Sequence, residues 1–244
     1  AEEWVKDQAV IDRSKRKYAH FDYRTDFGKA GKYVTDPVKV ARHGFYPFIH
    51  YTKEFKKYSK TEGKKAKKRE FCYAAHIDRC IYQYYNHLLN DIYIQRVHHD
   101  NISDCAVAYR SDLGKSNIHF AHEVFSFICC SAPCYIMIGD FTNFFDTLDH
   151  NYLKERLCDL LGVSQLPEDY YAVFKNITHY STWDLNDLLT LNKLSSADDL
   201  NHMQRVLSTE DFREHKHQYV KKNPNNYGIP QGSPISALLA NIYM

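Results

Sequence analysis

The sequence predicts an α+β protein that is rich in helices and carries one small antiparallel sheet. Apolar residues recur at helical spacing in several segments, and two short aromatic segments alternate with the period of a strand. Of the 244 residues, 44% are hydrophobic, which is enough for a sizeable core. No apolar run approaches the roughly 20 residues needed to cross a bilayer, and the N-terminus AEEWVKDQ is too polar for a signal peptide. With an odd count of seven cysteines, these features predict a cytoplasmic protein without membrane contact.

The first half of the chain is predicted to form an extension, a hairpin and a long helix. Residues 1–45 are polar and mixed, which is typical of an extension that wraps a later core. Residues 46–51 and 70–75 are predicted strands, and the lysine-rich segment between them contains Gly63, so we expect a hairpin. A helix is expected over residues 76–97, because their apolar side chains form one wide stripe.

The second half is predicted to contain further helices and one buried strand. Residues 134–139 are a short apolar run between Pro133 and Asp140, which predicts a buried strand that ends at Asp140. Residues 163–226 are helical and polar in patches and show no pattern that indicates chemistry. Helices are also expected at 118–128, 151–161 (with Gly162 as its left-handed C-terminal cap) and 235–242, and an irregular segment at 101–115.

The segment from Lys53 to Arg69 has a strong local positive charge. It contains nine basic residues against Glu54 and Glu62, although the net charge of the whole chain is only +2. Such a run is either a solvated loop or a surface that binds phosphate groups. The candidates for nucleic-acid binding in and after this segment are Lys64, Lys65, Lys67, Lys68 and Arg79.

The segment GDFTNFFDTLDH, residues 139–150, places Asp140 at the end of the predicted strand. A buried carboxylate is costly unless a cation or hydrogen bonds satisfy it. Nucleotidyl transfer supplies such a cation, since two divalent ions clamp the attacking oxygen, the transferred phosphate and the leaving pyrophosphate. Mg²⁺ suits this role because it binds few carboxylates together with substrate phosphates. Asp140 is therefore a candidate metal ligand, and the alternative is that it only caps the next segment.

The segment YGIPQGSP, residues 227–234, has the composition of a loop that approaches a ligand. Gly228 and Gly232 allow close approach of the backbone, and Pro230 and Pro234 restrict the loop. Gln231 offers both donors and an acceptor that suit a sugar or a base edge. A plain connector between a strand and a helix is the alternative interpretation.

Together, DFTNFFDTLDH and GIPQGSPISALLANIYM resemble the third and fourth conserved blocks of reverse transcriptases, and they occur in the same order. The most similar lineages are those of group II introns, retrons and the abortive-infection and phage-defence enzymes. KKREFCYAAHIDRCIYQYYNHLL and AYRSDLGKS resemble the fingers blocks more loosely, and KYAHFD and HGFYPFI resemble the defence lineage. The resemblance covers about residues 45–244 except 163–226. It implies a right-hand polymerase fold, here with fingers and an incomplete palm.

The resemblance also implies roles for individual residues. Asp140 would be the first catalytic aspartate and would bind Mg²⁺, or Mn²⁺ in its place, with help from the carbonyl of Phe141. Asp146 and Asp149 match positions that are more often structural. The remaining matches would contact nucleotide or nucleic acid: Arg69 at the phosphates, the amides of Asn143 and Phe144 near the triphosphate, Phe145 as a steric gate under the sugar, Gln231 and Gly232 beside the incoming nucleotide, and Arg110 on nucleic acid.

The expected organisation is an extension over 1–45, fingers over 46–130 and a partial palm over 131–244 with an inserted segment at 163–226. The family's second catalytic element, an aromatic-x-Asp-Asp turn on a hairpin, and its thumb are expected after the fourth block, and the sequence ends at Met244 before them. A single aspartate cannot hold two metals tightly, so we expect no polymerase activity from this chain alone. A longer protein or a completing chain would supply the rest.

The resulting hypothesis is an RNA-directed DNA polymerase that adds dNTPs to a primer and acts in phage defence. Its implied partners are an RNA template, a DNA or RNA primer, dNTPs, a dedicated non-coding RNA and a second copy or completing chain. Two alternatives stay open: template-independent or protein-primed DNA synthesis by the same fold, and a catalytically silent RNA-binding scaffold.

Overall fold

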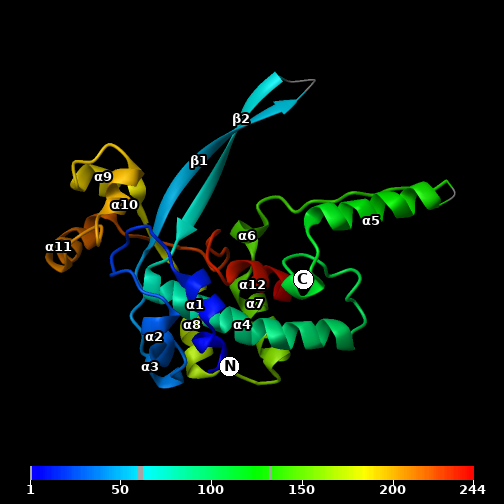
Figure 1. Ribbon diagram of the computed structural model, residues 1–244, viewed down its shortest axis with the longest axis horizontal. Coiled ribbons are helices and arrows are strands. Elements are labelled where there is room, and N and C mark those ends of the chain that lie inside the picture. Colours follow the sequence, from blue (N-terminus) through cyan, green and yellow to red (C-terminus); the bar gives the residue numbers. More distant parts are fainter. Residues whose placement is uncertain (1, 60–62, 132) are drawn as a thin grey trace.

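The computed structural model describes residues 2–59, 63–131 and 133–244 as a helix-rich α+β fold with a small four-stranded sheet (Figure 1). This confirms the predicted fold class at that level, and the polymerase fold stays a prediction. The strands are β1 (Phe48–Ser59), β2 (Gly63–Tyr73), β3 (Ser181–Asp184) and β4 (Lys221–Lys222). The helices are η1 (Trp4–Lys6), α1 (Gln8–Ser14), α2 (Phe27–Val34), α3 (Pro37–Ala41), α4 (His76–His99), η2 (Ser111–Leu113), α5 (Asn117–Cys130), α6 (Phe144–Thr147), α7 (His150–Leu161), α8 (Glu168–Thr178), α9 (Leu185–Leu191), α10 (Ala197–His202), α11 (Thr209–Tyr219) and α12 (Ser236–Tyr243).

The predicted basic hairpin is confirmed, and its two strands are longer than expected. β1 and β2 pair antiparallel from Ile49 opposite Tyr73 to Ser59 opposite Gly63, and the ribbon extends away from the helical body (Figure 1). The sheet as a whole is mixed rather than antiparallel, because β3 pairs parallel with β1 and β4 pairs antiparallel with β3. The strand order is β2-β1-β3-β4. The two added strands come from the segment 163–226, in which only helices were expected.

The helix α4 forms the centre of the main hydrophobic core. It contacts α2, α7, α8 and α12, and its buried side chains include Ile81, Tyr82, Tyr85 and Leu89. The same core contains residues from Val5 to Ile242, so it joins all three of the predicted segments. The helices predicted around residues 76–97, 118–128, 151–161 and 235–242 are all present, and Gly162 has the expected left-handed conformation with a φ of 66°.

The N-terminal extension fixes the start of α4. The helix lacks a cap from its own Ala75, and the carboxylate of Asp22 replaces it. Asp22 accepts hydrogen bonds from the backbone N–H groups of His76, at 3.0 Å, and Ile77, at 2.8 Å. The Tyr18 hydroxyl donates to the carbonyl of Ala74 at 2.8 Å. These contacts hold the junction between β2 and α4, where the hairpin leaves the body.

The segment 181–220 forms a second, smaller core against the other face of the sheet. Trp183 of β3 is fully buried and packs with Leu188, Leu200 and Val206. Phe21 of the N-terminal extension closes this core, with its ring centroid 5.2 Å from that of Trp183. α9, α10 and α11 therefore form a group beside the base of the hairpin (Figure 1).

The helix α5 is present where it was expected, but none of its residues is buried. It projects from the body as an arm (Figure 1). Over the described residues, no helix combines the length and the apolar character that a membrane crossing requires.

Asp78 on α4 gives the folded chain a pH dependence that can be measured. Its carboxylate is buried, lies 2.7 Å from Nε2 of His43 and accepts from the N–H of Tyr46 at 2.9 Å. Burial raises the pKa of Asp78 to about 6, against the opposing effects of His43 and Tyr46, whereas an aspartate in an unfolded chain has a pKa of about 3.9. The folded state therefore binds a proton more tightly than the unfolded state does.

We predict that the stability contributed by this proton is full below about pH 4 and is lost as the pH rises through about 6. Urea unfolding between pH 4 and pH 7 measures it. Asp78→Asn should remove this decline in the free energy of unfolding, whereas Asp104→Asn at an exposed position should keep it. Equal slopes for the wild type and Asp78→Asn would contradict the role of Asp78.

Candidate functional site

The two sequence blocks that indicate nucleotide chemistry lie in direct contact. The N–H of Gly228 donates to the carbonyl of Leu148, and the N–H of Ile229 donates to that of Phe145, both at 2.8 Å. Nε2 of His150 is 2.8 Å from the carbonyl of Gly228 and must donate, since a carbonyl only accepts. Burial lowers the pKa of His150, which favours the neutral ring. The loop 228–234 is therefore fixed on the segment that begins at Asp140.

The same loop also lies against the basic hairpin. The N–H of Cys72 on β2 donates to the carbonyl of Gln231 at 2.8 Å. Gly232 has a φ of 106°, and a Cβ atom there would lie 2.4 Å from the carbonyl oxygen of Cys72. Gly228 has a φ of 89°, and its Cβ would lie 3.0 Å from the carbonyl oxygen of Asp146. Both glycines are thus needed where the loop meets its two neighbours.

A cavity of about 1230 Å³ lies where the hairpin, the Asp140 segment and the loop meet. Eight of the predicted site residues line it: Lys68, Arg69, Asp140, Phe141, Asn143, Phe144, Phe145 and Gln231. The guanidinium of Arg69 also lies 5.6 Å from the ring centroid of Phe55. Gly232 is not among the lining residues, because it packs on β2. The side chains of Lys64, Lys65 and Lys67 lie outside the described part of the chain, although β2 includes their backbone.

Asp146, which the sequence assigned to structure, lines the cavity beside Gln231. Partial burial raises the pKa of Asp146, and a hydrogen bond from the side chain of Gln231 opposes that shift. Its position in the same block as Asp140 was the only signal in the sequence. His50, Tyr180, Lys221 and Lys222 also line the cavity and were missed. Their segments carry no pattern that indicates a site, and only the sheet brings them there.

Residues 134–139 do not form the buried strand that was predicted. They are extended and exposed, and Met137 and Ile138 retain 98% and 90% of their accessible surface. A strand needs a neighbour for its backbone hydrogen bonds, and no described strand pairs with this segment. The sheet instead lies on the opposite side of the cavity. Asp140 is therefore delivered by an exposed chain rather than by the end of a sheet strand.

The oxygen atoms near Asp140 suit a hard divalent cation, but they are too few to form a complete set of metal ligands. Asp140, Asp146 and the Phe141 carbonyl supply only oxygen, which fits Mg²⁺ or Mn²⁺ better than Zn²⁺. Within residues 2–59, 63–131 and 133–244, no three His, Cys, Asp or Glu side chains gather closely enough to hold a metal ion. Substrate phosphates would have to complete the coordination.

Two of the predicted nucleic-acid contacts are buried in the body of the protein. Arg79 is only 4% exposed, and its guanidinium donates to the carbonyl of Ser14 and the side chain of Gln83. Arg110 is 3% exposed and pairs with Asp112 at 2.5 Å. Neither guanidinium is available to a nucleic acid. Both residues instead hold local structure, because a buried guanidinium needs partners for its donors.

Neither a protein-family model nor a curated protein matches this chain. The resemblance to reverse transcriptases rests on the residues of the sequence blocks. The structure adds that those blocks lie in contact around one cavity.

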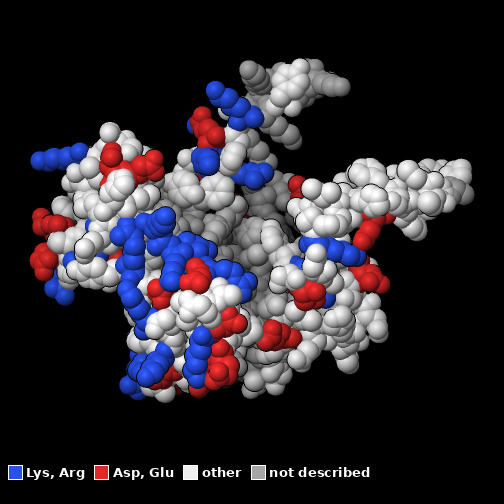
Figure 2. Space-filling view, viewed as in Figure 1, with Lys and Arg blue, Asp and Glu red and all other residues white. Residues whose placement is uncertain are grey.

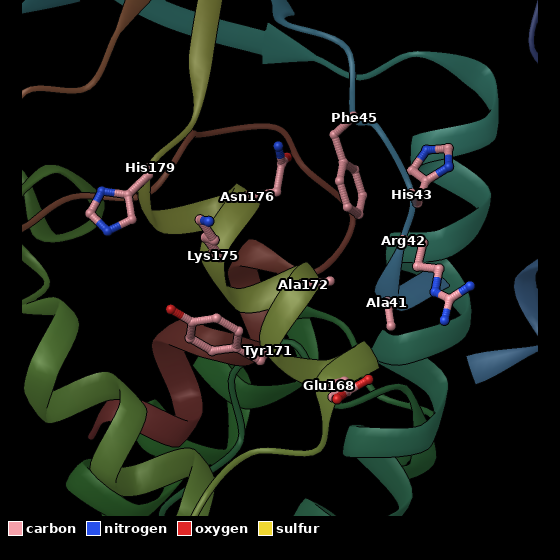
Figure 3. Close-up of a pocket in the computed structure, with 10 residues that line it drawn as sticks. All are labelled: Ala41, Arg42, His43, Phe45, Glu168, Tyr171, Ala172, Lys175, Asn176 and His179. Atoms are coloured by element: carbon pink, nitrogen blue, oxygen red, sulfur yellow. The ribbon is translucent and has the colours of Figure 1, made fainter. Parts of the chain in front are cut away.

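A second cavity, of about 510 Å³, lies between residues 41–45 and α8 (Figure 3). Figure 3 shows Lys175 and Asn176 on α8 across from His43 and Phe45. Both ring nitrogens of His43 are already engaged, by the Tyr33 hydroxyl at 2.9 Å and by Asp78. None of the predicted site residues lines this cavity, so we assign it no part in the candidate site.

The contact between Gly232 and Cys72 yields a prediction about stability. Gly232→Ala should lower the free energy of unfolding by about 3 kcal/mol, because backbone strain adds to an overlap that costs about 1–3 kcal/mol. Gly162→Ala is the matched control, since Gly162 has a φ of 66° and open space around its Cβ position. It should cost only about 1 kcal/mol. Urea denaturation measures both, and equal costs would show that the loop does not need its close approach to β2.

Proposed function

We propose that this chain provides the fingers and part of the palm of an RNA-directed DNA polymerase of the prokaryotic reverse-transcriptase type. The observation that carries the proposal is the single cavity that three separate sequence blocks line. Arg69 comes from the hairpin, Asp140 from the third block and Gln231 from the fourth. A nucleotide with its metal ion requires basic, acidic and hydrogen-bonding side chains around one space, and this cavity contains all three kinds.

In this proposal, different residues of the cavity bind different parts of the dNTP and the primer end. Asp140 and the carbonyl of Phe141 would hold Mg²⁺, which supplies charge neutralisation at the transferred phosphate. Arg69 would balance charge on the triphosphate from the hairpin. Gln231 would orient the nucleotide from a loop that hydrogen bonds fix on both sides. Phe145 would lie below the sugar and disfavour a 2′-hydroxyl.

A catalytically silent RNA-binding scaffold is the second candidate. The incomplete metal ligand set over the described residues and the unpaired segment 134–139 favour it. DNA synthesis without a template, or from a protein primer, is a variant of the leading proposal. Sequencing of the product separates that variant, because untemplated DNA does not mirror the supplied strand.

We predict that Asp140→Asn in the complete protein reduces dNTP incorporation on a primed RNA by roughly 100-fold or more, since it removes a charge that binds metal. Asp104→Asn, at an exposed position outside the cavity, is the control and should retain full activity. RNA binding is measured on the same preparations. Incorporation that is unchanged in Asp140→Asn would remove Asp140 from the site. RNA binding with no incorporation in the wild type would favour the scaffold.

A further inference from the structure

Two strands from the segment 163–226 widen the sheet that forms one wall of the cavity. β3 pairs with β1 and β4 pairs with β3, so the order β2-β1-β3-β4 places β4 at the edge opposite the second hairpin strand. Tyr180, Thr182, Lys221, Lys222 and Asn225 of this segment line the cavity that also contains Asp140 and Gln231. The resemblance to the reverse-transcriptase blocks implied no role for any of these residues.

The register of the sheet places Lys221 on the same face as the cavity-lining residues of the hairpin. Lys221 lies opposite Thr182, and Thr182 lies opposite Phe48. Residues in register share a face, and every second residue along a strand returns to it. His50 on β1, with Cys72 opposite it on β2, therefore belongs to that face. So does Lys68, which is opposite Glu54 and forms an exposed ion pair with its carboxylate at 3.1 Å. Of the residues on this face, five line the cavity: Lys221, Thr182, His50, Cys72 and Lys68.

The edge that carries the two lysines is held firmly. Nδ2 of Asn223 donates to the carbonyl of Thr178 at 3.0 Å and to that of Tyr227 at 3.1 Å. The N–H of Asn223 donates to the carbonyl of Tyr180 at 2.9 Å. These bonds connect β4 both to the start of β3 and to the loop that carries Gln231. The backbone that carries Lys221 and Lys222 is thus fixed with respect to the candidate site.

The charges of the lysines at this edge are not neutralised by nearby carboxylates. Asp184, the acidic residue of β3, accepts from the N–H of Asn186 at 2.8 Å and lies 3.2 Å from Nδ1 of His50. Lys221 and Lys222 are both exposed, and neither is within 4 Å of an acidic oxygen among the residues that the structure describes. Both lysines line the cavity, with Lys221 on its sheet face, and unneutralised ammonium groups at such a place attract anions.

The spacing of the basic groups distinguishes a compact anion from a polymer. β4 is three strands from β2, which is about 14 Å across the sheet at about 4.8 Å per strand. Lys68 is also about 20 Å farther along the strands than Lys221, because its partner Glu54 is six residues from Phe48. The two basic positions are therefore more than about 20 Å apart. One triphosphate cannot reach both, whereas a strand of several nucleotides can.

We propose that Lys221 and Lys222 bind the phosphate backbone of the single-stranded template RNA, and that the strand passes across the sheet from β4 to the basic hairpin. The nature of the strand rests on the proposed polymerase function. The contact itself requires only a polyanion long enough to follow the wall. The segment 163–226 would then act as an added template-binding wall rather than as a passive insertion.

The test measures binding of a fluorescent single-stranded RNA of about 20 nucleotides to the complete protein, by anisotropy at several salt concentrations. Lys221→Ala/Lys222→Ala should weaken binding roughly tenfold or more at 0.1 M salt. It should also reduce the slope of log K against log salt by about 1.4, since each lost phosphate contact on a single strand removes about 0.7. Lys221→Arg/Lys222→Arg retains both charges and should restore affinity and slope.

Lys29→Ala/Lys32→Ala on α2 is the matched control, because it removes two exposed lysines outside the cavity. It should leave both quantities within about twofold of the wild type. An unchanged affinity and slope in Lys221→Ala/Lys222→Ala would overturn the proposal, and so would an equal loss in the control. Circular dichroism verifies folding of each variant, and Lys221→Gln/Lys222→Gln, which removes both charges but keeps longer side chains, replaces the alanine variant if that one unfolds. Because no dNTP is used, failure here would leave the polymerase proposal, which Asp140→Asn tests, untouched.

Discussion

The main-chain hydrogen bonds of the loop 228–234 are the constraint on which the rest of the site depends. The loop bonds to Phe145 and Leu148 on one side and to Cys72 on the other. Backbone groups that are buried between elements must find partners, and here those partners come from two distant parts of the chain. Gln231, which lines the cavity, is therefore held in place both by the segment 145–148 and by β2. The two glycines make this approach sterically feasible, and residues with a side chain would hold the elements apart.

The base of the hairpin depends on the N-terminal extension in a similar way. β2 ends at Tyr73 and α4 begins at His76, so only two residues separate the basic ribbon from the central helix. Asp22 caps that helix. In the first turn of the helix, Asp78 pairs with His43 and accepts from the N–H of Tyr46, two residues before β1. A buried charge of this kind is costly unless it is paired. Its partners fix where the hairpin leaves the body, and with it the position of Lys68 and Arg69 at the cavity.

The two walls of the cavity differ in how they are built. The sheet wall is continuous through four strands and is backed by a second core around Trp183. The opposite wall depends on α6, α7 and the loop, while the chain before Asp140 is exposed and unpaired. The position of Asp140 therefore comes from the residues that follow it, because Phe145 and Leu148 accept the hydrogen bonds of the loop. The rigid wall carries the basic side chains together with Glu70 and Asp184, and the less supported wall carries Asp140 and Asp146.

The sequence by itself determined the local elements and the identity of the candidate nucleotide-binding groups. Helical periodicity located α4, α7 and α12, alternation and charge located the hairpin, and Gly162 marked a helix end, since each of these depends on neighbours in the chain. The blocks around Asp140 and Gln231 named six of the residues that line the cavity: Asp140, Phe141, Asn143, Phe144, Phe145 and Gln231. Only the tertiary structure decided that Arg79 and Arg110 are buried, that residues 134–139 lack a partner strand, and that Lys221 faces the same cavity as Lys68. Burial and strand pairing depend on contacts between residues far apart in sequence, and no local pattern records which of those contacts will form.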